Sequence, residues 1–410
     1  MRLSSSLWAQ HLGRMIKRHW YIQGNRPIIQ TATESYLKSQ NIEIVEPEIL
    51  LVQQLPERLK LNEPLIPLPL PKDKTHPNWK DKPCLSYRDH NVLLEGVEQA
   101  KVLTKTVEIV DGLPESVNNL ITEHDERVEE LVLRTVYNST IYDAYQERLP
   151  KPKDPERPGF MFPRPYGISA IRKARNLSQK LLQLCESLSG PQVAFERNLI
   201  YNGVVSLPIE KDEKQLQFEL RADMLVTSTS PLKPMASKGE GNDIQLPNLH
   251  PIDSTITLEK ENIYTLRNFY PIMKNSQWMN VHTIFAHFNP REVKNIYETP
   301  VTESQILGRS LLKSFAVGAA CARQRFGNEV LSLSEPVTVQ CIQSDGKMFH
   351  FSVLQLNTLD LNGSGGERNI WWSAPNINLY EKAGYEGGIP TVQNYNPEVF
   401  RRIFAFYNNN

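Results

Sequence analysis

The sequence predicts an α+β fold, in which helices and mixed or antiparallel β-hairpins follow extended, proline-rich N-terminal strips. The helices are predicted because apolar residues recur at three- and four-residue steps through 169–190 and 302–327. The clearest hairpin is predicted because apolar and polar residues alternate on both sides of a glycine turn within 336–357. Helices followed by a mixture of strands and helices are typical of the α+β class.

Both long helices have recognisable ends. Ser169 can cap the first helix and Gly190 can close it. Thr302 and Gln305 can form a capping box on the second helix, and Gly327 stands at its exit. Shorter elements are expected at four further places: helices at 91–106 and 113–121, a hairpin turn at Asn202-Gly203, and a strand at 216–220.

The turn within 336–357 decides which side chains share a face of the sheet. A two-residue turn at 345–346 would place the two apolar faces on opposite sides. A three-residue loop at 344–346 would pair Cys341 with Phe349 and align the two faces, with its glycine in the left-handed position. We therefore predict the three-residue loop.

The N-terminal segment is basic, amphipathic and free of acidic residues as far as Glu34. Its first twenty residues include Arg2, Arg14, Lys17 and Arg18. Such a segment is typical of a mitochondrial transit peptide, whereas a secretory signal would need an unbroken apolar run of about 7–15 residues. We therefore expect import into the mitochondrial matrix. The alternative is a solvated helix at the start of a cytosolic protein.

Proline-rich stretches mark further boundaries, at 63–83 and 149–165. Proline lacks a backbone donor and restricts its predecessor, so both stretches are expected to be extended. They are either linkers or strips that pack on the body or on a partner. The predicted organisation is a mitochondrial transit peptide (1–33), an extended proline-rich segment (34–90) and an α+β body (91–410) with a sub-boundary near 149–168.

Composition argues against several protein classes. The 410 residues carry 46 basic and 46 acidic side chains, which does not indicate a uniformly basic nucleic-acid coat. Four widely separated cysteines fit buried thiols in a reducing compartment better than a disulfide framework. No apolar stretch approaches about 18 residues, so we expect no membrane span.

Catalytic and metal-binding motifs are not evident. His282 and His287 are five positions apart, a spacing that suits neither one helix face nor one strand face, so we interpret them as structural. The glycine-rich stretch 363–368 lacks the ending of a phosphate loop. Cys321 lies within a helical pattern and is expected in the core. We predict no catalytic residues, no cofactor and no metal, and hence no enzyme.

One local charge excess points to RNA. Residues 147–180 contain nine cations and three acids, interleaved with aromatic side chains. Cations neutralise phosphates, and aromatic rings can stack on unpaired bases. The alternative is a soluble linker followed by a solvated helix face. The residues predicted to bind RNA are Arg148, Lys151, Lys153, Arg157, Arg164, Arg172, Lys173 and Arg175.

Several long stretches resemble one known family. LLEGVEQAKVLTKTVEIVDGLPESV (93–117) is similar to the mitochondrial large-subunit ribosomal protein thirty-seven family, and so is HPNWKDKPC (76–84) before it. The stretches at 326–361 and 396–407 resemble the same family, in the same order. The region from about 122 to 300 is more divergent and contains the basic residues. The family is related to the programmed-cell-death-nine type of mitoribosomal protein.

The resemblance implies a structural component of the large mitochondrial ribosomal subunit. Its expected partners are mitochondrial large-subunit rRNA and other mitoribosomal proteins, including the programmed-cell-death-nine type paralogue. Two alternatives remain: a matrix enzyme or RNA-processing factor whose active site is dispersed along the sequence, and an interaction protein that visits the ribosome during assembly.

Overall fold

The fold is α+β, as the sequence predicts. The computed structural model describes residues 5–24, 32–46, 48–49, 74–77, 84–109, 112–151, 156, 159–252, 259–261, 266–289, 293, 300–363 and 365–410. The chain divides into two compact units, residues 1–70 and 71–410, which are described separately.

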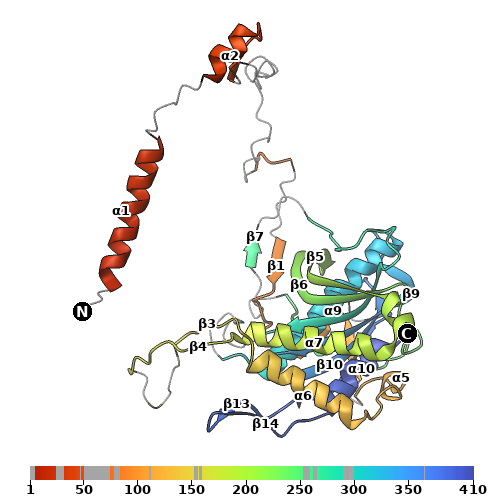
Figure 1. The fold of residues 1–410 in the computed structure, drawn as a ribbon. Helices are drawn as coiled ribbons and strands as arrows, with labels where there is room; N and C mark the ends of the chain where they lie inside the picture. The colour runs from red at the N-terminus through yellow and green to blue at the C-terminus, as the bar shows by residue number, and fades with distance from the viewer. Residues whose placement is uncertain are drawn as a thin grey trace. The chain divides into compact units, whose positions relative to one another are not determined.

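The described residues of the first unit include the helices α1 (Ser5–Gly24) and α2 (Thr33–Ser39) (Figure 1). The apolar side chains of Met15, Ile16 and Trp20 on α1 are exposed. An amphipathic helix of this kind has an apolar stripe available for another surface. Most of the predicted proline strip at 63–83 lies outside the described residues.

The second unit is built on a mixed ten-stranded sheet, counted over the described residues. Its order is β2-β11-β10-β9-β8-β6-β1-β7, with β12 also pairing with β10 and β5 with β6. The pairs β1–β6, β8–β9 and β11–β2 are parallel. The strands are β1 (Cys84–Arg88), β2 (Thr106–Ile109), β5 (Arg197–Lys211), β6 (Lys214–Ser228), β7 (Glu259–Glu261), β8 (Asn280–His287), β9 (Ser332–Ser344), β10 (Met348–Thr358), β11 (Asn369–Ser373) and β12 (Ile377–Asn378).

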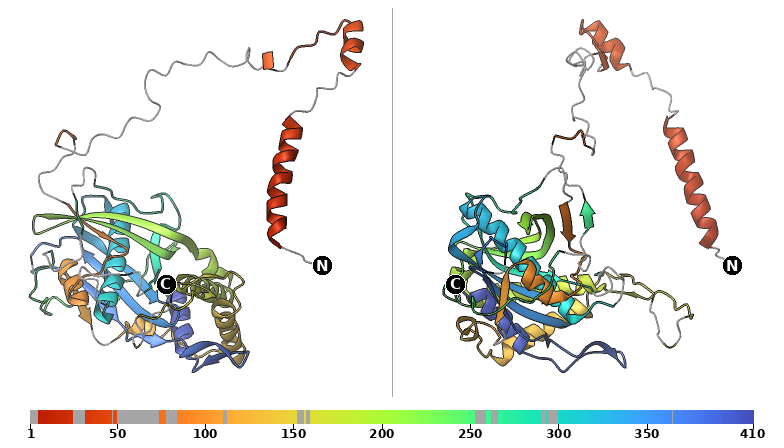
Figure 2. Two further views of the ribbon diagram at one scale, coloured as in Figure 1. Left: turned by 90° about the vertical axis from the view of Figure 1, so that its left-hand side faces the viewer. Right: turned by 180° about the vertical axis from the view of Figure 1, so that it is seen from behind.

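Helices cover both faces of this sheet (Figures 1 and 2). One core joins α9 (Glu303–Phe326) and α4 (Gly96–Leu103) to the sheet. The second core joins α6 (Glu126–Thr140), α7 (Ala170–Ser189) and α10 (Glu398–Asn408) to the other face. The remaining short elements are α5 (Glu115–Asn118), α8 (Pro191–Glu196) and two small hairpins, β3 (Glu147–Arg148) with β4 (Tyr166–Gly167) and β13 (Lys382–Glu386) with β14 (Ile389–Gln393).

Two glycines allow α4 and α9 to approach closely. A Cβ atom on Gly308 would lie 2.9 Å from the carbonyl carbon of Gly96. Gly96 itself has a φ of +60°, a conformation that glycine adopts readily. The helix predicted at 91–106 therefore begins only at Gly96, and Thr106 already belongs to β2.

The predicted ends of the long helices are largely confirmed. Thr302 and Gln305 form the capping box of α9, and Gly327 follows the helix with a φ of 110°. Gly190 follows α7 with a φ of 81°. Ser169 stands at the N-cap of α7, but its side chain makes no capping hydrogen bond, so that detail was wrong.

The predicted register of the hairpin within 336–357 is wrong. Cys341 pairs with Ser352, and Phe349 pairs with Ser344. Cys341 therefore faces away from Phe349 and packs toward α9, while Phe349 packs toward α7 and α10. The prediction assumed one buried face, but both faces of this sheet are covered, so the two apolar sets need not align. Gly346 does adopt the left-handed conformation, with a φ of 96°.

The hairpin turn predicted at Asn202-Gly203 is also wrong. β5 continues through this point, although Asn202 has a φ of 52°. The chain turns instead at Asp212 and Glu213, with φ angles of 49° and 61°. Two consecutive left-handed residues are typical of the type I′ turn that joins twisted strands. The predicted strand at 216–220 is confirmed as part of β6, and Figure 2 shows the long hairpin of β5 and β6 in green.

Candidate functional site

The described residues in the first half of the predicted RNA-binding region form an arm, which we define as residues 147–151 and 159–167. β3 and β4 pair at its base, with Arg148 opposite Tyr166. The backbone nitrogen of Leu149 donates to the carbonyl oxygen of Pro165 at 2.8 Å. Figure 1 shows the two strands leading away from α6 and α7. The described part of the arm is thus extended, as its prolines predict.

Arg164 holds the arm together. Its Nε donates to the carbonyl oxygen of Leu149 at 2.8 Å, and its Nη2 donates to that of Arg148 at 2.7 Å. Hydrogen bonds from a charged group are stronger than neutral ones, so this side chain stabilises the pairing of the two strands. Arg164 is therefore a structural residue of the arm as well as an exposed cation.

The arm exposes apolar and aromatic side chains. Phe160 is 59% exposed, Met161 74% and Tyr166 71%. The rings of Phe160 and Phe162 contact each other edge to face, with centroids 4.5 Å apart. Large exposed apolar groups that lie close together are typical of a surface that binds a partner. Arg148 and Lys151 are exposed in the same arm.

The second half of the region lies on α7, and its cations differ in environment. Arg172 forms an ion pair with Asp143, and its guanidinium lies 4.6 Å from the centre of the Tyr145 ring. Lys173 is partly buried, and burial lowers the pKa of its ammonium group. Arg175 is exposed, with its guanidinium 5.8 Å from the centre of the Tyr201 ring.

The structure therefore separates the predicted cations into groups. Arg148, Lys151 and Arg164 share the arm, whereas Arg172, Lys173 and Arg175 share the first turns of α7. Lys153 and Arg157 lie outside the described residues. No local pattern indicates that Arg172 has an internal partner, since Asp143 is 29 positions away.

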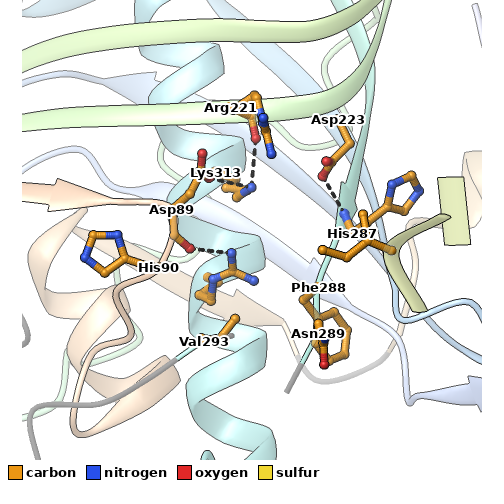
Figure 3. A pocket seen from close by; sticks show the side chains of 11 residues that line it. Asp89, His90, Arg221, Asp223, His287, Phe288, Asn289, Val293 and Lys313 are labelled. Atoms are coloured by element: carbon orange, nitrogen blue, oxygen red, sulfur yellow. Dashed lines mark hydrogen bonds and ion pairs between the residues drawn. The ribbon is translucent and has the colours of Figure 1, made fainter. Parts of the chain in front are cut away.

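A pocket in the body forms a second candidate site (Figure 3). It has a volume of about 140 Å³ and lies where β6, β8 and α9 meet the loop after β1 and the start of α7. Polar groups from these elements line the pocket. One of them is His287, which the sequence analysis interprets as a structural residue. The others that matter for its chemistry are Asp89, Arg221, Asp223, Arg309 and Lys313.

Ion pairs and hydrogen bonds fix most polar groups of this pocket. Lys313 Nζ lies 2.8 Å from Asp89 Oδ1 and donates to the carbonyl oxygen of Arg221 at 2.8 Å. Arg309 Nη2 donates to the carbonyl oxygen of Asp89 at 2.6 Å. Asp223 Oδ2 accepts a hydrogen bond from the backbone nitrogen of His287 at 2.7 Å (Figure 3). The two carboxylates are thus engaged within the protein.

The histidines are placed as structural groups. Burial lowers the pKa of His287 to about 4, so its ring is neutral at neutral pH, and its Nε2 lies 2.9 Å from Ser178 Oγ. His282 Nε2 lies 2.8 Å from the carbonyl oxygen of Asn409, and burial lowers its pKa to about 3. A base with such a low pKa is poorly matched to proton transfer at neutral pH. Cys321 is buried, as expected, and burial raises the pKa of its thiol.

The described residues contain neither a metal-binding cluster nor a helix that could span a membrane. No group of three or more His, Cys, Asp or Glu side chains there is arranged to hold a metal ion. In the same part of the chain, no helix has the length and apolar character needed to span a bilayer.

Comparison with known proteins identifies similar chains along most of the length. The chain is 28% identical over 349 residues to the rat (Rattus norvegicus) large ribosomal subunit protein mL37. The matched region covers 81% of this chain and 76% of the relative. The chain is 28% identical over 356 residues to the cattle (Bos taurus) protein of that name, covering 82% and 78%. The chicken (Gallus gallus) protein is 27% identical over 354 residues, covering 83% and 77%.

A family described as mitochondrial 28S ribosomal protein S30 (PDCD9) matches residues 293–410. That description names the 28S particle, whereas the relatives are named for the large subunit. The relatives decide the choice of subunit, because they match most of the chain and the family matches only its last part. The match to both names confirms the resemblance seen in the sequence.

Proposed function

We propose a function for this chain from the premise that it is a homologue of the mL37 ribosomal proteins. It is a structural constituent of the large subunit of the mitochondrial ribosome and acts in the mitochondrion. The observation that carries this function is the similarity over about four fifths of the chain to proteins with that name. rRNA and other ribosomal proteins are its partners.

We propose that the RNA contact is made by the arm and the adjoining turns of α7. Arg148, Lys151 and Arg175 are exposed there, and Phe160 supplies an exposed ring. An extended arm with cations and aromatic rings suits a groove of folded RNA, where phosphates and unpaired bases are both accessible. Arg172 is expected to position this surface through Asp143 and to contribute charge. Lys153 and Arg157 belong to the same proposal by sequence.

The family match supports a proposal for a specific protein neighbour. Residues 293–410 match the PDCD9 family, so we propose that the programmed-cell-death-nine type paralogue is a direct partner in the subunit. Cross-linking of purified subunits followed by mass spectrometry tests this contact. Cross-links from this chain to other proteins, with none to the paralogue, would refute it.

The first unit fits the role of an import address. α1 has exposed apolar residues, and residues 1–33 carry basic side chains but no acidic ones. We propose that residues 1–33 are removed after import, leaving a segment that contains most of α2 and leads to β1 (Cys84–Arg88), the first strand of the sheet in the body. Sequencing the N-terminus of the protein purified from mitochondria gives the cleavage point directly. A mature chain that still begins at residue 1 would contradict this proposal.

Sedimentation of the tagged full-length protein from lysed mitochondria tests the main proposal. We expect travel with the large subunit in constant proportion, at both moderate and high salt. Migration as a small free particle would overturn the ribosomal role and favour the alternative of a matrix enzyme or RNA-processing factor. The ion-paired Asp89, the hydrogen-bonded Asp223 and the neutral His287 of the pocket give that alternative little chemical support.

A charge variant tests the RNA contact separately. Replacing Arg148, Lys151 and Arg175 together by Gln removes exposed cations but keeps the Arg172–Asp143 ion pair. We expect weaker retention on the subunit. The slope of the logarithm of the binding constant against the logarithm of the salt concentration should become shallower by about 0.7–0.9 for each phosphate that is no longer neutralised. The matched control replaces three exposed cations elsewhere, Arg127, Arg134 and Lys274. If both variants are retained on the subunit as well as the natural chain, protein contacts hold the chain in place.

A further inference from the structure

The pocket of Figure 3 contains buried polar atoms whose hydrogen-bonding capacity is unused. Arg309 is only 5% exposed and lines the pocket, yet its Nη1 has no hydrogen-bond partner among the described residues. The Nδ1 of buried His287 and the Oδ1 of Asp89 also lack a hydrogen-bond partner there, although Asp89 Oδ1 lies 2.8 Å from Lys313 Nζ. A buried polar group left unpaired costs free energy, so a ligand that supplies acceptors would be favoured here.

Cations outnumber carboxylates around this pocket. Arg221, Arg309 and Lys313 line it, and Arg175 lies near enough to contribute to the lowered pKa of His287. The facing carboxylates are Asp89 and Asp223. Among the residues that line the pocket, one positive charge therefore remains in excess, in a partly buried site where screening by salt is weak.

Both carboxylates of the pocket take part in contacts within the protein. Asp89 is paired with Lys313 through its side chain and with Arg309 through its backbone carbonyl. Asp223 accepts a hydrogen bond from the backbone N–H of His287, which offsets part of the cost of removing its charge from water. Arg221 is exposed at the pocket, and the structure uses its carbonyl oxygen as an acceptor for Lys313. Arg221 is exposed and lines the pocket, so its side chain is available to an entering group.

We propose that this pocket binds a phosphate group, with Arg309 as the buried cation and Arg221 as the outer cation. Arginine suits phosphate because its planar guanidinium donates two parallel hydrogen bonds. A volume of about 140 Å³ accommodates one such group. The pocket touches the start of α7 through Ile171, next to the turns assigned to RNA. The identification of the phosphate as one of the RNA backbone rests on the proposed function.

Two measurements on the full chain test the proposal. The first compares the thermal unfolding midpoint in inorganic phosphate and in chloride at equal ionic strength and pH. The second measures binding of a fluorescently labelled single-stranded RNA as salt is varied. Arg221→Gln is the test variant, because only the carbonyl oxygen of Arg221 takes part in the hydrogen bonds described for the pocket. Arg221→Lys keeps the charge, and Arg134→Gln removes an exposed charge on α6 as the control.

We expect phosphate to raise the unfolding midpoint of the natural chain and Arg221→Gln to weaken phosphate binding about three- to tenfold. Arg221→Lys should restore part of the effect, and Arg134→Gln should not change it. If the phosphate is that of RNA, Arg221→Gln should also reduce the salt slope of RNA binding by about 0.7.

The outcomes separate this pocket from the proposed RNA contact. Stabilisation by phosphate that depends on Arg221, without any RNA binding, would support a pocket for free phosphate and refute the RNA contact. If RNA binding does not depend on Arg221 and phosphate gives no specific stabilisation, the proposal of a phosphate-binding pocket is refuted, while the proposed RNA contact is unaffected. An equal effect of Arg134→Gln would also overturn it, since the effect would then reflect overall charge.

Discussion

Arg172 holds the carboxylate of Asp143 with two hydrogen bonds, from Nε to Oδ2 at 2.5 Å and from Nη2 to Oδ1 at 2.9 Å. Asn176, one turn further along α7, donates to the same carboxylate. The backbone nitrogen of Tyr145 donates to Asp143 Oδ1 as well. The loop before β3 is therefore tied to the first turns of α7, and this fixes the base of the arm.

We predict that Arg172→Gln lowers the unfolding midpoint at neutral pH. The Arg172 guanidinium lowers the pKa of Asp143 through its hydrogen bond, and the N–H of Tyr145 adds to this. A lowered carboxylate pKa stabilises the fold above the unfolded value of about 4 and loses this effect as the pH falls through the folded pKa. The deficit of the variant should thus be constant between about pH 5 and pH 7 and shrink in more acidic solution. Urea unfolding measures this loss of stability in four proteins: the natural chain, Arg172→Gln, Asp143→Asn and the double variant. If the losses of the two single variants add up to that of the double variant, the two side chains are not paired.

The C-terminal residues are held by buried polar contacts. The carbonyl oxygen of Asn409 lies 2.8 Å from His282 Nε2 and 3.1 Å from Arg197 Nη2. Its side-chain nitrogen donates to Gln340 Oε1 at 2.9 Å. We predict that Asn409→Ala lowers the free energy of unfolding by about 1–3 kcal/mol, because it leaves a buried acceptor without its donor. Urea unfolding checks this against Asn119→Ala, which alters an exposed side chain in another part of the body; equal losses would count against the buried contact.

How much could be predicted from the sequence depended on whether the signal was local. The capping box of Thr302 and Gln305 was predictable, because both partners lie within one turn of the same helix. The register of Cys341 with Ser352 was not, because it depends on helices packing on both faces of the sheet. Long-range packing of this kind overrides the rule that one strand face is buried.

The candidate site shows the same division. Composition predicted the cluster of cations near Arg172, and proline content predicted the extended arm. The partner Asp143 could not be predicted, nor could the pocket around Arg309. Its lining comes from segments up to 224 positions apart, between Asp89 and Lys313, and no local pattern joins them.

We predict that acid destabilises the body through its buried histidines. Burial lowers the pKa of His282 to about 3, of His287 to about 4 and of His350 to about 3. In the unfolded chain these rings bind protons below about pH 6.5, so the unfolded state takes up more protons as the pH falls from there toward the folded pKa values. Stability should therefore fall by about 1 kcal/mol per pH unit for each histidine across this window.

The free energy of unfolding measured against pH checks this expectation. His350→Gln should reduce the slope between about pH 6 and pH 5 by close to one proton, since it removes one buried ring. His250→Gln removes an exposed ring and serves as the control. A slope that is the same in His350→Gln and the natural chain would show that other groups drive the acid response.

We predict that the exposed aromatic side chains of the arm contribute to binding independently of charge. Phe160→Ser combined with Met161→Ser should leave the free energy of unfolding within about 0.5 kcal/mol, because both side chains are exposed. The same variant should weaken retention on the ribosomal subunit at low and high salt alike, since stacking and apolar contacts are less sensitive to ionic strength than phosphate contacts. The control is Ile389→Ser on β14, which removes a side chain that is also exposed. Retention equal to that of the natural chain would mean that the arm binds through its cations alone.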